Sequence, residues 1–98
     1  MQIRWMPLAE QDLDAAYEYV RQDNSPAASR LLGRIFKAVE MLSQYPSAGR
    51  PSRVPSTREL VIVHTPYIVV YHPTGKEIQI LAVIHGARRW PASFGESG

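Results

Sequence analysis

The chain has 98 residues, no cysteine, and a formal charge of +2 from 11 basic and 9 acidic side chains. This length fits one domain, and 45% hydrophobic with 20% charged residues is typical of a globular protein rather than a disordered one. Without cysteine there are no disulfides, thiolate nucleophiles or cysteine-based zinc sites. The apolar runs are too short to span a bilayer and the N-terminus lacks an export signal, so we expect a cytoplasmic protein without membrane association.

The two halves of the chain differ in charge. Residues 1–45 hold five basic and six acidic side chains, a balance of −1, whereas residues 46–98 hold six basic and three acidic ones, a balance of +3. Arginine is suited to bidentate recognition of phosphate or carboxylate. The distribution predicts a basic second half that contacts a partner, although any one arginine is also compatible with an ordinary solvated surface. Five of the six later cations are arginines: Arg50, Arg53, Arg58, Arg88 and Arg89.

The first half predicts a strand and two helices. Residues 2–5 are typical of a short strand, and Pro7 suits the start of a helix that runs to about Arg21 with apolar side chains at helical spacing. A break follows, at which Ser25 is the expected N-cap and Pro26 the first helical residue of a second helix. Because the break is so short, the two helices must form an antiparallel hairpin.

The second half predicts a loop and three strands. Residues 45–57 contain three prolines and a glycine, which is typical of a loop, and strands are expected at 59–64, 67–71 and 77–85. The order β-α-α-β-β-β predicts an α+β two-layer sandwich, with the helical hairpin packed on a largely antiparallel four-stranded sheet. We expect the other sheet face to be solvated or to bind a partner. Residues 1–98 would form one domain, with a frayed tail at 93–98.

Histidines and arginines are the side chains that could carry chemistry. The three histidines are too scattered for a metal motif, so we expect neither a metal nor a cofactor. His85, which ends the last predicted strand, could be a general acid/base or a structural strand-end histidine. Arg58, at a strand entrance, could hold a phosphate or pair with an acidic residue of the helical hairpin.

Aromatic residues suggest contacts rather than catalysis. Tyr67 and Tyr71 are four residues apart on one predicted strand, so their side chains should share a face. Trp90 follows Arg88 and Arg89, and this combination could contact RNA or protein, or the indole could fold back onto the core. Trp5 is expected to anchor the core.

Taken together, short motifs along nearly the whole chain resemble the RelE/ParE superfamily of bacterial type II toxins. The motifs occur in the order and at the spacing of that superfamily, and its fold has the β-α-α-β-β-β order predicted above. They are Trp5, Ala9 and Asp12-Leu13; Tyr17–Val20; Asn24–Ala28; Pro46–Arg50; Thr57–Val61; Pro66–Tyr71; and His85–Pro91.

The resemblance implies a toxin that a cognate antitoxin wraps and neutralises. The antitoxin carries the DNA-binding part, so the toxin would meet promoter DNA only indirectly. The superfamily divides into ParE-like members, which inhibit DNA gyrase, and RelE-like members, which cut mRNA on the ribosome. A third reading is an inactive relative that binds only its antitoxin.

The residues favour the ParE-like branch. Arg58 matches the arginine that RelE-like nucleases use against the scissile phosphate, and His85 and Arg88 would complete a metal-free endonuclease. The lysine pair and the C-terminal tyrosine expected of RelE are missing, however, so we expect gyrase inhibition and keep ribosome-dependent mRNA cleavage as the alternative. Candidate contacts with the target or the antitoxin are Arg50, Arg53, Arg58, Tyr67, Tyr71, Arg88, Arg89 and Trp90.

Overall fold

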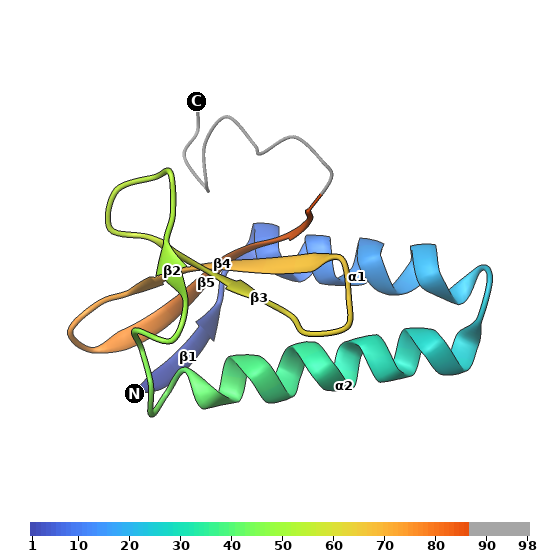
Figure 1. The fold of residues 1–98 in the computed structure, drawn as a ribbon, viewed down its shortest axis with the longest axis horizontal. Coiled ribbons are helices and arrows are strands. Elements are labelled where there is room, and N and C mark those ends of the chain that lie inside the picture. The colour runs from blue at the N-terminus through green and yellow to red at the C-terminus, as the bar shows by residue number, and fades with distance from the viewer. Residues whose placement is uncertain (87–98) are drawn as a thin grey trace.

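A computed structural model describes residues 1–86, which form two layers, a helical hairpin on a five-stranded sheet (Figure 1). The sheet has the order β1-β5-β4-β3-β2, in which β1 runs parallel to β5 and the other neighbours are antiparallel. The α+β class and the largely antiparallel sheet are therefore confirmed. The elements are β1 Gln2–Trp5, α1 Pro7–Arg21, α2 Ser25–Met41, β2 Arg50–Pro51, β3 Arg58–Val61, β4 Tyr67–Pro73 and β5 Glu77–His85.

The predicted number of strands was too low by one. The extra strand β2 lies in the predicted loop, where Arg50 pairs with Glu59 and Pro51 with Arg58. A proline is tolerated there because β2 is at the edge of the sheet, where a strand needs no donor on its outer side. A two-residue strand also has too few positions to show a periodic pattern.

The helices lie where the sequence predicts them, but the cap between them differs. The Asn24 side chain accepts a hydrogen bond from the backbone N–H of Ala27 at 3.0 Å, so Asn24 is the N-cap and Ser25 is already helical. Asparagine and serine are about equally good caps, so residue preference could not distinguish two adjacent candidates. Neither helix of the described chain is long and apolar enough to cross a membrane.

The main core lies between the helical hairpin and the sheet. It is built from apolar side chains of α1, α2, β4 and β5, with Tyr67 and Tyr71 in the same cluster, as their shared parity predicts. On the opposite face Val70 and Ala82 are also fully buried, so the centre of that face is not solvated, and partner binding there stays a prediction. The largest fully buried aliphatic side chains of the main core are Ile35, Leu42, Ile62, Val69, Ile78 and Ile80.

A half-buried carboxylate joins α1 to β5. Asp12 accepts a hydrogen bond from the backbone N–H of Val83 at 3.0 Å, close to an irregularity at which the β4–β5 register shifts after Val70. Burial raises the pKa of the Asp12 carboxyl, and the hydrogen bond from Val83 opposes this only in part. The contact holds the last strand against the first helix.

Candidate functional site

The loop before β2 is held against the sheet by Tyr71. The Tyr71 hydroxyl donates to the Pro46 carbonyl at 2.7 Å and accepts from the Gly49 N–H at 2.9 Å. Burial raises the pKa of this hydroxyl, although the Gly49 N–H and the Arg58 charge oppose the shift. A Cβ at Gly49 would lie 2.6 Å from the Glu59 carbonyl oxygen and 2.8 Å from a ring carbon of Tyr71, so only glycine fits.

Two of the predicted site arginines support this loop. Arg58 donates from Nη1 to the Gly49 carbonyl at 2.6 Å, and Arg50 holds the Glu59 carboxylate through Nη2 at 2.7 Å and Nε at 2.8 Å. Their guanidinium groups therefore brace the protein's own backbone and an acidic side chain. We call Gly49, Arg50, Arg58, Glu59 and Tyr71 the braced loop. Arg53 is exposed on the same segment.

The structure does not bring Arg58 and His85 together. Arg58 pairs with Tyr71 near one end of β4, whereas His85 pairs with Tyr67 at the other end. Four residues of extended strand separate these positions by about 13 Å along the sheet. The other predicted contacts, Arg88, Arg89 and Trp90, lie outside the described residues, as does the tail at 93–98.

His85 and Tyr67 instead line a groove of about 300 Å³, which we call the basic groove. Their rings meet edge to face, with centroids 5.4 Å apart. The groove lies between the helical hairpin and the turn that joins β3 to β4, and Figure 1 shows this turn beside α2. Its lining residues are Tyr19, Val20, Ala27, Arg30, Leu31, Arg34, His64, Thr65, Pro66, Tyr67 and His85.

Two exposed arginines stand one helical turn apart on the wall of the basic groove. Arg30 and Arg34 make neither a hydrogen bond nor an ion pair with any residue in the described structure. Like charges at this spacing destabilise a helix by about 0.2–0.5 kcal/mol. Neither residue was predicted as a site residue. One signal was present in the sequence, because no acidic residue lies three or four positions from either of them.

The opposite wall of the basic groove is a tight turn, where a strand was predicted. β3 ends at Val61, and His64 lies exposed in the turn with a positive φ of 67°. Thr65 holds the turn, because its hydroxyl donates to the Ile62 carbonyl at 2.9 Å and accepts from the Tyr67 N–H at 3.1 Å. The predicted strand over 59–64 was therefore too long at its end, and His64 faces the groove instead of continuing the sheet.

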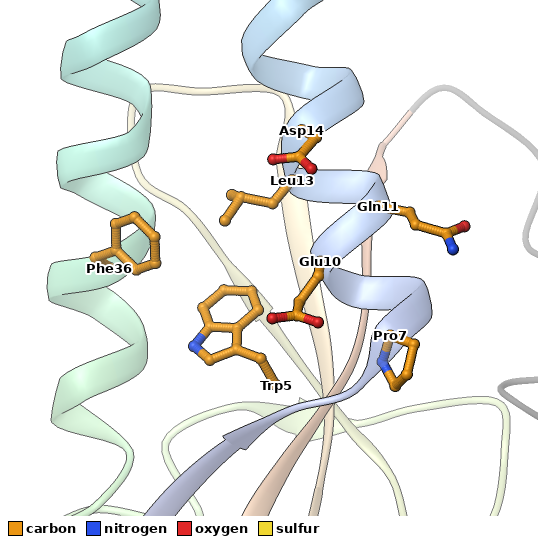
Figure 2. Close-up of a pocket in the computed structure, with 7 residues that line it drawn as sticks. All are labelled: Trp5, Pro7, Glu10, Gln11, Leu13, Asp14 and Phe36. Carbon is orange, nitrogen blue, oxygen red and sulfur yellow. The ribbon is translucent and has the colours of Figure 1, made fainter.

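A second groove, of about 510 Å³, has the opposite charge (Figure 2). Trp5, at the end of β1, packs beside the core and meets Phe36 of α2 edge to face, with ring centroids 5.6 Å apart. Glu10 and Asp14 of α1 line the same groove, and Figure 2 shows both carboxylates on the side that faces Trp5. We call this the Trp5 groove.

The described residues contain no cluster of three histidine, aspartate or glutamate side chains that could hold a metal ion. The chemistry that the described residues offer is electrostatic. The basic groove presents two arginines and the Trp5 groove presents two carboxylates. The arginines of the braced loop already have partners within the protein.

The chain is similar to known toxins over most of its length. The family model described as "ParE toxin of type II toxin-antitoxin system, parDE" matches residues 3–90. The protein named "Putative toxin Y4kP" from Sinorhizobium fredii is 43% identical over 89 residues, which cover 91% of this chain and 92% of that protein. "Toxin RelE2" from Caulobacter vibrioides is 34% identical over 87 residues, covering 89% and 97% of the two chains.

Two solved structures share the fold. A chain of the chromosomal ParDE TA system from P. aeruginosa superposes with a TM-score of 0.79 at 35% identity, covering 87% of this chain and 95% of that one. The YoeB dimer from Staphylococcus aureus superposes with a TM-score of 0.57 at 17% identity over 84% and 92%, which is a likeness of fold alone. On the family match and these relatives, the chain belongs to the ParE toxin family of type II toxin–antitoxin systems, within the RelE/ParE superfamily.

Proposed function

We propose that this toxin arrests growth in the cytoplasm by binding and inhibiting DNA gyrase, and that a cognate antitoxin neutralises it. The observation that carries the proposal is the similarity to a chain of the ParDE system, at 35% identity and a TM-score of 0.79. In this proposal residues 1–98 act as one toxin domain, and promoter DNA is met only through the antitoxin. Inhibition depends on protein–protein contact and requires no metal or cofactor.

Ribosome-dependent cleavage of mRNA is the second candidate, favoured by the 34% identity to the relative named RelE2. Arg58, His85 and Arg88 would then balance charge on the scissile phosphate and assist proton transfer. The register of β4 separates Arg58 from His85, and Arg58 already donates to the Gly49 carbonyl. Both observations favour inhibition by contact over cleavage.

The two functions are tested with one preparation of purified toxin. With gyrase, relaxed plasmid and ATP, we expect supercoiling to stop at toxin concentrations close to that of gyrase, and to resume when antitoxin is added. With programmed ribosomes, we expect the mRNA in the A site to stay intact. Undiminished supercoiling at a large excess of folded toxin would contradict the proposal.

The ribosome assay includes Arg58→Ala as its matched variant. Cuts in the A site that disappear in this variant, while circular dichroism shows that it is folded, would replace gyrase inhibition with the second candidate. Cuts that persist unchanged would exclude the role that the superfamily resemblance gives to Arg58.

A further inference from the structure

We propose that the basic groove docks an acidic segment of a partner protein, whose aspartate or glutamate side chains pair with Arg30 and Arg34. The inference rests on the proposed function only in that the antitoxin is the natural source of such a segment. It places recognition on the helical hairpin, at the α2 wall of the groove, rather than on the arginines of the second half.

The unused charge of the groove supports an anionic occupant. Arg30 and Arg34 are exposed and have no partner among residues 1–86, whereas Arg21 on α1 forms a salt bridge with Glu18 at 2.9 Å. None of the described residues that line the groove is acidic. Arginine and carboxylate form strong bidentate hydrogen bonds, which would offset the repulsion between the two arginines.

The distance between the two arginines determines how far apart the acidic side chains of the docked segment must be. Positions four residues apart on α2 are separated by about 6 Å along the helix axis. Acidic side chains match this distance when they are four residues apart on a helix or two residues apart on an extended segment, where they are about 6.7 Å apart. An acidic pair with either periodicity can therefore reach both guanidinium groups at once.

The floor of the groove favours a peptide over a nucleic acid. Val20, Ala27 and Leu31 line the same groove as the two arginines and contribute apolar surface, which suits an apolar side chain carried between two acidic ones. Nucleic-acid affinity depends on many phosphate contacts with a broad basic surface, and the whole chain has a formal charge of only +2. An amphipathic acidic segment uses both the charge and the apolar floor.

The test is titration of the ¹⁵N-labelled full-length toxin with a synthetic helical peptide that carries two glutamates four residues apart and a leucine between them. We expect the Nε–Hε signals of Arg30 and Arg34 to shift, and a peptide with glutamine in place of both glutamates to leave them in place. The Arg30→Gln/Arg34→Gln double variant should bind at least tenfold more weakly. The matched control, Lys37→Gln/Lys76→Gln, removes the same charge outside the groove and should change affinity less than twofold.

Three results would overturn the assignment. The first is an absence of shifts at the groove with millimolar glutamate peptide, and the second is equal weakening by the two double variants. The third is an oligothymidylate that moves the same signals at lower concentration than the peptide, which would make the groove a nucleic-acid site. Gyrase is absent from these measurements, so failure of the docking proposal and failure of gyrase inhibition are separate outcomes.

Discussion

The braced loop and the basic groove each contain two arginines, but among residues 1–86 only the arginines of the braced loop have partners. Arg58 holds the Gly49 carbonyl and Arg50 holds the Glu59 carboxylate, whereas Arg30 and Arg34 have no partner in the described part of the chain. The comparison shows that a local excess of arginine does not identify a binding surface. What identifies one is arginine that the fold leaves without a carboxylate or carbonyl.

The net charge of each half does not show which of its arginines already have partners within the protein. The second half has a balance of +3, yet two of its arginines have partners in the loop. The first half has a balance of −1 and supplies the two arginines of α2 that have no partner among residues 1–86. The acidic residues of the first half do not neutralise that pair. Glu10 and Asp14 line the separate Trp5 groove, and Glu18 is engaged with Arg21.

The comparison predicts the largest loss of stability from Gly49→Ala in the braced loop. The new Cβ would collide with the Glu59 backbone and the Tyr71 ring, so we expect the free energy of unfolding to fall by roughly 2–3 kcal/mol in urea denaturation. Gly33→Ala is the matched control, because Gly33 lies on α2 between the groove arginines with open space around it. It should stabilise the helix by about 0.5–1 kcal/mol, and equal effects of the two substitutions would contradict this account.

Tyr71→Phe removes the hydroxyl that ties the loop to the sheet. The Pro46 carbonyl and the Gly49 N–H would each lose a partner, which should lower the free energy of unfolding by about 1–3 kcal/mol. Tyr45→Phe, at a side chain that is 60% exposed, should change it by less than about 0.5 kcal/mol. If thermal denaturation gave the two variants the same stability, the braced loop would not depend on Tyr71.

Asp12 is half-buried, and its carboxylate accepts one hydrogen bond, from the Val83 N–H. Asp12→Ala leaves the Val83 N–H without its acceptor and should cost about 1–2 kcal/mol, whereas Asp12→Asn keeps an acceptor oxygen and should cost less. Urea denaturation of both variants measures the difference. Equal losses would show that the hydrogen bond to Val83 is not what the carboxylate contributes.

The same pair of variants tests the pH dependence. Because burial raises the pKa of Asp12, the folded state binds this proton more tightly than the unfolded state does. The contribution of Asp12 to stability therefore falls as the pH rises from the ordinary carboxyl pKa through the raised value, and is regained in acid. Asp12→Asn should remove this part of the slope in a series of denaturation curves.

We expect the smallest changes in the free energy of unfolding from single arginine substitutions, one in the braced loop and one in the basic groove. Arg58→Gln should lower the free energy of unfolding by about 1 kcal/mol, because the Gly49 carbonyl loses a charged donor. Arg34→Gln should leave stability within about 0.5 kcal/mol, or raise it slightly by relieving repulsion from Arg30. A larger loss for Arg34→Gln than for Arg58→Gln, in parallel urea titrations, would mean that the groove arginines serve the fold.

Much of the fold was predictable because local patterns specify it. A helix or strand shows in its sequence which of its faces are buried. In α1 and α2 the signal is the spacing of apolar residues, and in β4 and β5 it is alternation or a continuous apolar run. Two boundaries were placed wrongly. Asn24 and Ser25 are near-equivalent candidates for one cap, and the structure uses Asn24. Residues 62–64 leave the strand for a turn that Thr65 stabilises.

The candidate site was less predictable because it depends on residues distant in the sequence. Tyr67 and His85 were identified as candidates, but the groove that they share needs α2 and the β3–β4 turn to meet them. Arg58 was identified as a possible phosphate contact, and the structure places its guanidinium against Gly49. Gly49 lies 9 positions from Arg58 and 22 from Tyr71, and contacts between residues so far apart leave no periodic pattern in the sequence.

By itself, the amino-acid sequence determined the helical hairpin, the largely antiparallel sheet, the superfamily and a total charge of +2, because each depends on local composition and pattern. Only the tertiary structure decided which arginines pair with other groups among residues 1–86 and which do not. Whether a guanidinium is available depends on the carbonyls and carboxylates within about 3 Å of it. For Arg30, Arg34, Arg50 and Arg58, that distance is set by strand register and helix packing.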